Sequence, residues 1–306
     1  MISIIGAGRV GSISAFNILR SRISDVMLID VREGLAQGEA LDMRQASPAI
    51  EFDGRIEGSN NLADMAGSEL VIVTAGMARQ PGSSRADLAE TNAKMVSSIV
   101  QEIVRYAPKC KIMMVTNPVD AMTYLATKQS GFERNRVFGM SGILDALRYR
   151  SYLATELGVS REDVRGLVIG EHGDRMIPLV NYTTVSGIPI KRLLTADKIE
   201  RIMVKTKSSG MDVIGLKGST AHAPAAVIAI MADAVLRGRN RVMGASVVPE
   251  GEYGLKDVAV GLPIALGSNG VERIVELELD EREERQLKDA ADSIQSTIRQ
   301  ANPKAD

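Results

Sequence analysis

The side chains best suited to acid–base chemistry lie in the second half of the chain. Histidine is scarce, with only His172 and His222. His172 stands in Gly170-Glu171-His172-Gly173, directly after the apolar run 167–169, so its imidazole is expected at a strand end where it can face a cleft. An imidazole titrates near neutrality and can take or return a proton. The alternative is a loop histidine without a role, which is how we interpret His222, at an expected helix start among alanines.

A carboxylate and a guanidinium lie three residues apart in a predicted helix over residues 142–157. Asp145 and Arg148 therefore project from one face of that helix. A solvated surface pair is the plain interpretation. In the functional interpretation, Asp145 bonds one imidazole nitrogen of His172 and stabilises its charged form. Arg148 then holds a substrate carboxylate through two parallel hydrogen bonds, which a lysine cannot copy.

The segment 76–85 is a third candidate, because it follows the apolar strand expected over residues 70–73 and carries Arg79 and Arg85 six residues apart. Open α/β sheets bind ligands at such strand ends. Its glycines would let it move, so we predict a mobile lid that closes over a substrate and delivers an arginine. The alternative is a solvated basic loop.

Gly6-Ala7-Gly8-Arg9-Val10-Gly11 fits the pattern G-x-G-x-x-G, between an expected strand over residues 2–5 and a helix over 10–20. Gly6 would make the tight turn, Gly8 would let a pyrophosphate approach the backbone, and Gly11 would let helix and strand pack closely. Asp30 ends the next strand, 19 residues after Gly11, where its carboxylate would accept hydrogen bonds from ribose hydroxyls. The pattern predicts NAD, although Arg32 leaves NADP open. A glycine turn without a ligand is the alternative.

The fold predicted from the order of apolar runs is α/β. Short strands that are apolar but for Ser3 (2–5, 26–29, 70–73 and 112–115) alternate with helices (10–20 and 86–106), which indicates a parallel sheet covered on both faces. We predict an N-terminal Rossmann-type doubly wound sheet over residues 1–140 and a C-terminal α+β substrate domain over residues 141–306. The second part is expected to hold helices over 198–214, 223–236 and 281–300, and an antiparallel meander over 242–248, 256–263 and 270–276.

Composition argues against several classes of protein. The net charge is −1, from 37 basic and 38 acidic residues, so no basic surface for nucleic acid is expected. The longest apolar stretch, near 223–236, carries Asp233 and is too short for a membrane span. A single cysteine, Cys110, allows no internal disulfide, and the first residues do not resemble a signal peptide. We therefore expect a cytoplasmic protein, and we predict no metal site.

Taken together, these motifs resemble the lactate/malate dehydrogenase superfamily, and the resemblance covers essentially the whole chain. It rests on residues 6–11, Asp30, the arginine segment, 115–118, 142–148 and 170–174. The resemblance implies that His172 is the proton acceptor, Asp145 its partner, Arg148 the ligand of the C1 carboxylate, and Arg85 the group that polarises the reacting carbonyl. It implies cofactor contacts at Gly6, Gly8, Arg9, Val10, Gly11, Asp30, Asn92, Val115 and Asn117, with Asn117 also facing the substrate. It further implies a homo-oligomer, a tetramer favoured over a dimer.

Arg79 decides which hydroxy acid we expect. By resemblance, the malate enzymes of this superfamily have an arginine six residues before the catalytic lid arginine, where lactate enzymes have a glutamine. Oxaloacetate offers Arg79 a second carboxylate, whereas pyruvate offers only a methyl group and would leave a guanidinium unpaired in a water-poor pocket. We therefore predict oxidation of (S)-malate to oxaloacetate. The alternatives are an L-lactate dehydrogenase, and a nucleotide-binding protein that has lost catalysis.

Overall fold

The computed structural model describes residues 1–77 and 85–301, with the side chains of residues 85 and 86 outside that description. Its first half is built on six parallel strands in the order β3-β2-β1-β4-β5-β6. These are β1 (Ile2–Ile5), β2 (Val26–Ile29), β3 (Ile56–Ser59), β4 (Leu70–Val73), β5 (Lys111–Met114) and β6 (Val137–Gly139). Every residue of β1, β2 and β4 is buried, as expected for strands that are covered on both faces. This strand order is that of a dinucleotide-binding sheet.

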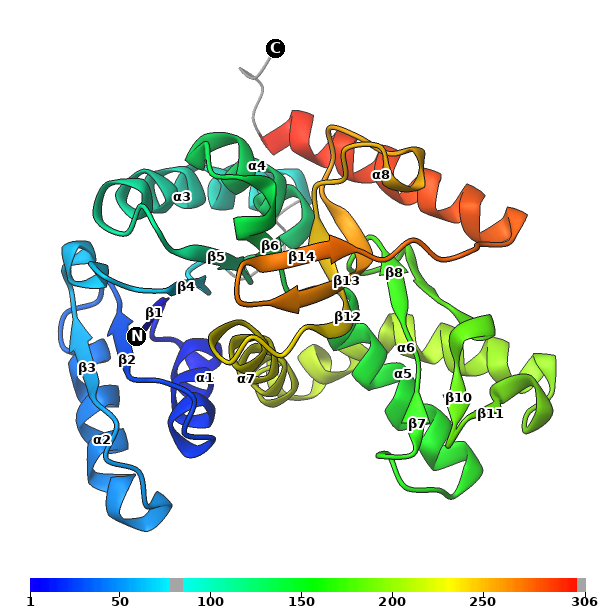
Figure 1. Ribbon diagram of the computed structural model, residues 1–306, viewed down its shortest axis with the longest axis horizontal. Helices are drawn as coiled ribbons and strands as arrows, with labels where there is room; N and C mark the ends of the chain where they lie inside the picture. Colours follow the sequence, from blue (N-terminus) through cyan, green and yellow to red (C-terminus); the bar gives the residue numbers. More distant parts are fainter. Residues whose placement is uncertain (78–84, 302–306) are drawn as a thin grey trace.

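Helices cover both faces of this sheet (Figure 1). The helices α3 (Arg85–Tyr106), α4 (Val119–Ser130) and α8 (Glu281–Ala301) pack together on one face, while α1 (Arg9–Arg20) and α7 (His222–Leu236) pack together on the other. Helix α2 (Leu35–Ile50) lies beside β3 near the outer edge. Helix α7 is apolar around most of its circumference, which suits an element enclosed by neighbours. Two helices from the second half of the chain thus cover the sheet of the first half.

The second half extends the same sheet with antiparallel strands. These are β12 (Arg241–Val247), β13 (Val260–Gly267), β14 (Gly270–Ile274), β8 (Val168–Gly170) and β9 (Met176–Pro178). Ser246 of β12 pairs with Gly139 of β6, and this bridge joins the two parts. A separate small sheet contains β7 (Val164–Arg165), β10 (Thr184–Val185) and β11 (Ile188–Pro189). Short 3₁₀ turns cover Leu62–Met65, Arg134–Arg136, Val180–Tyr182, Ile190–Arg192 and Glu252–Gly254.

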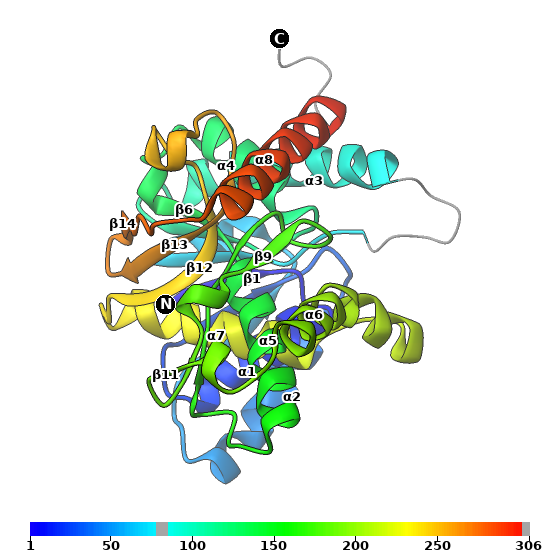
Figure 2. The same ribbon diagram turned by 90° about the vertical axis from the view of Figure 1, so that its right-hand side faces the viewer.

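Two long helices complete the second half. Helix α5 (Gly142–Leu157) begins directly after β6, and α6 (Ala196–Lys217) packs against it. In Figure 2, α6 projects from one side of the molecule. Gly142 allows the close approach of α5 to the sheet, because a Cβ at this position would lie 2.2 Å from the carbonyl oxygen of Val168. The start of α5 is therefore held against β8, the strand that precedes His172.

The predicted α/β class and the antiparallel meander are confirmed, but one strand was misplaced. The strand predicted over residues 256–263 is β13, Val260–Gly267, which starts four residues later. The predicted strand ended at Pro263, a residue type that has no N–H to donate to a neighbouring strand. In the structure it lies opposite Gly244, and its carbonyl still accepts from the Val275 backbone N–H at 2.8 Å, so the strand continues through it. Other predicted helix and strand ends shift by no more than three residues.

Candidate functional site

The glycine loop after β1 has the steric requirements that its pattern predicts. Gly6 has φ +108°, and a Cβ there would lie 2.7 Å from the Ala75 backbone nitrogen. A Cβ on Gly11 would lie 1.8 Å from the Gly6 carbonyl oxygen. A Cβ on Gly8, in contrast, would meet no atom within 4 Å. Gly8 is also the N-cap of α1 and provides no side-chain cap, so first-turn N–H groups stay available for an anion. These features fit the pyrophosphate of a dinucleotide.

Asp30 at the end of β2 is held in place by the backbone on both sides. The Ala7 N–H donates to Oδ2 at 2.8 Å, and the Arg32 N–H donates to Oδ1 at 2.9 Å. The Arg32 side chain is 66% exposed and its Nε lies 3.5 Å from the same carboxylate. Asn60, which we did not predict, donates to the carbonyl oxygens of Asp30 and Arg32. Each carboxylate oxygen keeps a further lone pair for ribose hydroxyls.

Asn92 joins two strand ends beside the glycine loop. Its side chain is fully buried, and its Oδ1 accepts from the Met77 N–H at 2.8 Å. Its Nδ2 donates to the carbonyl oxygens of Met77 at 3.2 Å and Asn117 at 2.7 Å. Val115 is buried, whereas Asn117 is exposed at the end of β5. The structure therefore joins the predicted Asn92 and Asn117 by a hydrogen bond, with Val115 two residues before Asn117, and both amide hydrogens of Asn92 are used within the protein.

His172, Asp145 and Arg148 form one hydrogen-bonded group. Nδ1 of His172 lies 2.8 Å from Oδ2 of Asp145, and Nη1 of Arg148 donates to Oδ1 of Asp145 at 3.1 Å. The Asp145 side chain is only 1% exposed, while those of His172 and Arg148 are 15% and 14% exposed. Asp145 lies in the first turn of α5, where the helix dipole favours a negative charge. With Nδ1–H donating to Asp145, Nε2 is the nitrogen left to exchange a proton with a ligand.

The environment of His172 favours its protonated form. Burial by itself would lower the pKa of the imidazole, but the charge and the hydrogen bond of Asp145 outweigh burial, so the pKa lies above its ordinary value. The charge of Asp120 also raises the pKa of His172, whereas the charge of Arg148 lowers it. An imidazole with a raised pKa is a stronger proton acceptor, which suits the removal of a hydroxyl proton.

Sequence reasoning missed Asp120, the second residue of α4. Its Oδ2 accepts a hydrogen bond from the His172 backbone N–H at 2.8 Å, and the side chain is 3% exposed. An acidic residue in the first turn of a helix is common, so the sequence offered no sign of this contact.

Arg9 reaches from the glycine loop to the segment between α6 and α7. Its Nη1 donates to Oγ of Ser219 at 3.3 Å. Val10 follows it in the first turn of α1 and is half-buried. Of the two arginines in the predicted lid, Arg79 lies outside the described residues. Arg85 starts α3, and its side chain lies outside them as well.

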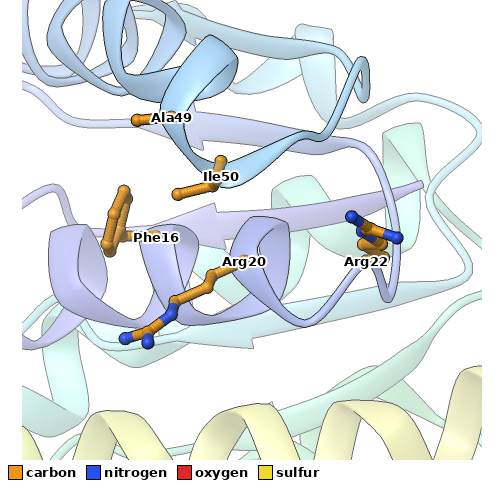
Figure 3. A pocket seen from close by; sticks show the side chains of 5 residues that line it. All are labelled: Phe16, Arg20, Arg22, Ala49 and Ile50. Atoms are coloured by element: carbon orange, nitrogen blue, oxygen red, sulfur yellow. The ribbon is translucent and has the colours of Figure 1, made fainter.

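A pocket of about 420 Å³ lies elsewhere on the surface (Figure 3). It is lined by Phe16, Arg20, Arg22, Ala49 and Ile50, close to the C-terminal ends of α1 and α2. The glycine loop is at the opposite end of α1, so this pocket does not belong to the site. Among residues 1–77 and 85–301, no three His, Cys, Asp or Glu side chains are grouped to hold a metal ion. Within that part of the chain, no helix is long and apolar enough to cross a membrane.

Comparisons with known proteins identify the family of the chain. The family model of the lactate/malate dehydrogenase NAD-binding domain matches residues 1–139, and that of the α/β C-terminal domain matches residues 143–304. A malate dehydrogenase of Staphylococcus saprophyticus is 46% identical over 98% of this chain and 97% of its own length. The solved malate dehydrogenase of Salinibacter ruber has a TM-score of 0.94 at 40% identity, covering 99% of this chain and 97% of that one.

A solved lactate dehydrogenase is also similar. The enzyme of Cryptosporidium parvum, in complex with lactic acid and nicotinamide adenine dinucleotide, has a TM-score of 0.94 at 32% identity, over 98% of this chain and 97% of that chain. By TM-score, the fold of this lactate dehydrogenase is as similar to that of our chain as the fold of the Salinibacter ruber malate dehydrogenase is, but its sequence identity is lower. With both family models matching and near-complete coverage, this chain belongs to the lactate/malate dehydrogenase family.

Proposed function

We propose that this chain catalyses the reversible oxidation of (S)-malate to oxaloacetate. The observation that carries the proposal is the hydrogen-bonded group of His172, Asp145 and Arg148, in the same molecule as a glycine loop suited to a dinucleotide. The high similarity to malate dehydrogenases supports malate over lactate as the substrate.

Each side chain of the group has a distinct task in this proposal. Arg148 binds the C1 carboxylate of malate and so sets the C2 hydroxyl beside the imidazole. Nε2 of His172 takes the hydroxyl proton, and Asp145 stabilises the imidazolium that results. A bound nicotinamide supplies the hydride acceptor for this chemistry. In the reverse direction the imidazolium returns the proton to the carbonyl oxygen.

We further propose that the two lid arginines complete the substrate site. Arg85 stabilises charge that develops on the C2 oxygen, and Arg79 binds the second carboxylate of malate. Support comes from their positions in a sequence that is 43–46% identical to curated malate dehydrogenases. Arg79→Gln should therefore lower kcat/KM for oxaloacetate far more than for pyruvate.

NAD is the proposed cofactor, in preference to NADP. The Asp30 carboxylate, fixed at the end of β2, would accept hydrogen bonds from a ribose diol and repel a 2′-phosphate. The nearby guanidinium of Arg32 is the group that would weaken this preference. The ratio of kcat/KM for NADH and NADPH measures the outcome, and Asp30→Ser should move that ratio toward NADPH.

Self-association is also proposed, with a tetramer favoured over a dimer. Helix α6 exposes apolar side chains, with Val204, Met211 and Leu216 at 61%, 63% and 89% exposure. Exposed apolar side chains gathered on one helix favour contact with another protein surface. Sedimentation velocity at several protein concentrations tests this directly. We also propose that the protein works in the cytoplasm, in agreement with its single cysteine, Cys110, which is buried.

The decisive experiment for the reaction is NADH oxidation by the purified protein, with oxaloacetate and pyruvate tested separately. A strong preference for oxaloacetate supports the proposal. A preference for pyruvate would overturn the substrate assignment but not the role of His172. The variant His172→Asn should lose turnover and still bind NADH, whereas a non-catalytic nucleotide-binding protein would show turnover with neither substrate.

A further inference from the structure

Asp120 is a buried carboxylate directly beneath the loop that carries His172. Its Oδ2 accepts from the His172 backbone N–H, and its Oδ1 has no hydrogen-bond partner within the described part of the chain. The Ser246 hydroxyl is close enough to lower the pKa of the carboxylate as a hydrogen-bond donor, although Ser246 Oγ has no partner within normal hydrogen-bond geometry in the described part of the chain. A buried charged group normally has hydrogen-bond partners for all of its acceptor positions, because burying it without them costs free energy. The presence of a carboxylate at this position therefore requires an explanation.

The place of Asp120 in the fold links two parts of the site. It lies three residues after Asn117, at the start of α4, while its hydrogen bond reaches the loop after β8. Ser246, on the strand between, pairs with Gly139 on one side and Gly261 on the other. Asp120 therefore connects the strand end that carries Asn117 to the backbone of the proton-accepting residue.

We propose that Asp120 is a positioning residue for proton transfer at His172, which fixes the loop that carries the imidazole and adds a second negative charge to that of Asp145. The proposal rests on the proposed function, in which His172 is the proton acceptor. The hydrogen bond that joins Asp120 to His172 goes to the His172 backbone, so Asp120 acts through that residue rather than on the substrate.

The charges around this pair come from three elements. Asp120 is on α4, Asp145 and Arg148 are on α5, and Glu171 precedes His172 on the loop after β8. Glu171 is itself paired with Arg175, whose Nη1 lies 3.2 Å from Oε2 of Glu171. Burial raises the pKa of Asp120 to about 6, although Ser246 and the His172 N–H oppose the rise. Asp120 is therefore charged above about pH 6, where it raises the pKa of His172.

The variant Asp120→Asn separates the two parts of the proposal. Its amide oxygen can still accept from the His172 N–H, but the negative charge is gone. The pKa of His172 should then fall, because one of the negative charges that raise it is removed. Asp120→Ala removes the charge and the acceptor together, and should lower kcat further because the loop loses its anchor. A matched control is Asp257→Asn, which removes the same charge from a side chain that is 65% exposed near the other end of α4.

The sequence makes the key measurement simple, because the chain has only two histidines. Imidazole resonances of isotope-labelled protein, assigned with a His222→Gln variant, give the pKa of His172 without any substrate. We expect a lower pKa in Asp120→Asn and no change in Asp257→Asn. In parallel, the acid limb of kcat/KM for malate oxidation should move to lower pH in Asp120→Asn, with little change in the affinity for NADH.

An unchanged His172 titration in Asp120→Asn overturns the proposal, even if the variant is less stable. In case both Asp120 variants fail to fold, the wild-type protein gives an independent test. Its His172 backbone amide resonance should show a titration step near pH 6 that is separate from that of the ring, and the absence of this step also overturns the proposal. A normal titration shift together with no activity toward malate would instead count against the proposed function.

Discussion

Replacement of Gly11 by alanine should damage both the fold and the cofactor site. The added Cβ would lie 1.8 Å from the Gly6 carbonyl oxygen and 3.0 Å from Oγ1 of Thr74. A relaxed carbon–oxygen contact of roughly 3.3 Å requires α1 and β1 to separate by about 1.5 Å. Such overpacking typically costs about 1–3 kcal/mol in the free energy of unfolding.

The same displacement moves the N–H groups at the start of α1 away from a bound pyrophosphate. Hydrogen bonds to charged groups contribute about 1.5–3 kcal/mol each, so losing one lowers the affinity for NADH roughly 10–100-fold. Thermal or urea unfolding measures the first effect, and titration of NADH fluorescence measures the second. Unfolding curves and NADH affinity both equal to those of the wild type would refute the steric argument.

Two matched glycine variants separate the effects. Gly8→Ala adds a Cβ that meets no atom within 4 Å, so the unliganded protein should keep its stability while NADH binds more weakly. Gly38→Ala also meets no atom within 4 Å and lies inside α2, so it should raise the free energy of unfolding by about 0.5–1 kcal/mol and leave NADH affinity unchanged. Equal loss of stability in Gly8→Ala and Gly11→Ala would contradict the argument.

Three further predictions follow from buried or paired groups. Asp145→Asn should lower the pKa of His172, because burial then acts without its main opposing charge, so the acid limb of malate oxidation should move to lower pH while kcat falls. Tyr149→Phe should leave the free energy of unfolding unchanged or raise it by up to about 1 kcal/mol in urea titrations. The buried Tyr149 hydroxyl has no partner within normal hydrogen-bond geometry in the described part of the chain, and the nearby Thr183 hydroxyl already donates to the Leu179 carbonyl oxygen. The hydrogen bond from Arg134 lowers the pKa of Glu252 from 4.5 to about 2, so this pair stabilises the fold above pH 4.5 and the stabilisation is lost as the pH falls to 2. The free energy of unfolding should therefore change less with pH between 4.5 and 2 in Glu252→Gln than in the wild type.

The sequence predicted best those features of the site that lie close together along the chain. Gly6, Gly11 and Asp30 lie within one strand–helix–strand unit, where spacing along the chain fixes positions in space. The contact between Asp145 and His172 spans 27 residues, and it was predicted from what the chemistry requires rather than from any local pattern. Asp120 shows why the rest was missed, since its meaning depends on a loop 52 residues away.

Pro263 shows a second limit of sequence reasoning. A proline is a strong local argument against a strand, but its effect depends on which backbone groups face a neighbour at that position. Only the pairing with Gly244 and the hydrogen bond from Val275 reveal that β13 tolerates it. The roles of Arg79 and Arg85 remain predictions.

The shared sheet has a consequence for how the chain is made. Residues 1–140 hold all six parallel strands, yet β6 pairs with β12, and the two faces are covered in part by α7 and α8. During synthesis at roughly 5–20 residues per second, the first half leaves the ribosome roughly 10–30 s before α8 is complete. Over that interval the apolar surfaces beneath α7 and α8 and the free edge of β6 are exposed. We therefore expect the nascent chain to be recognised by chaperones that bind apolar segments, and a fragment ending at residue 140 to aggregate rather than bind a dinucleotide.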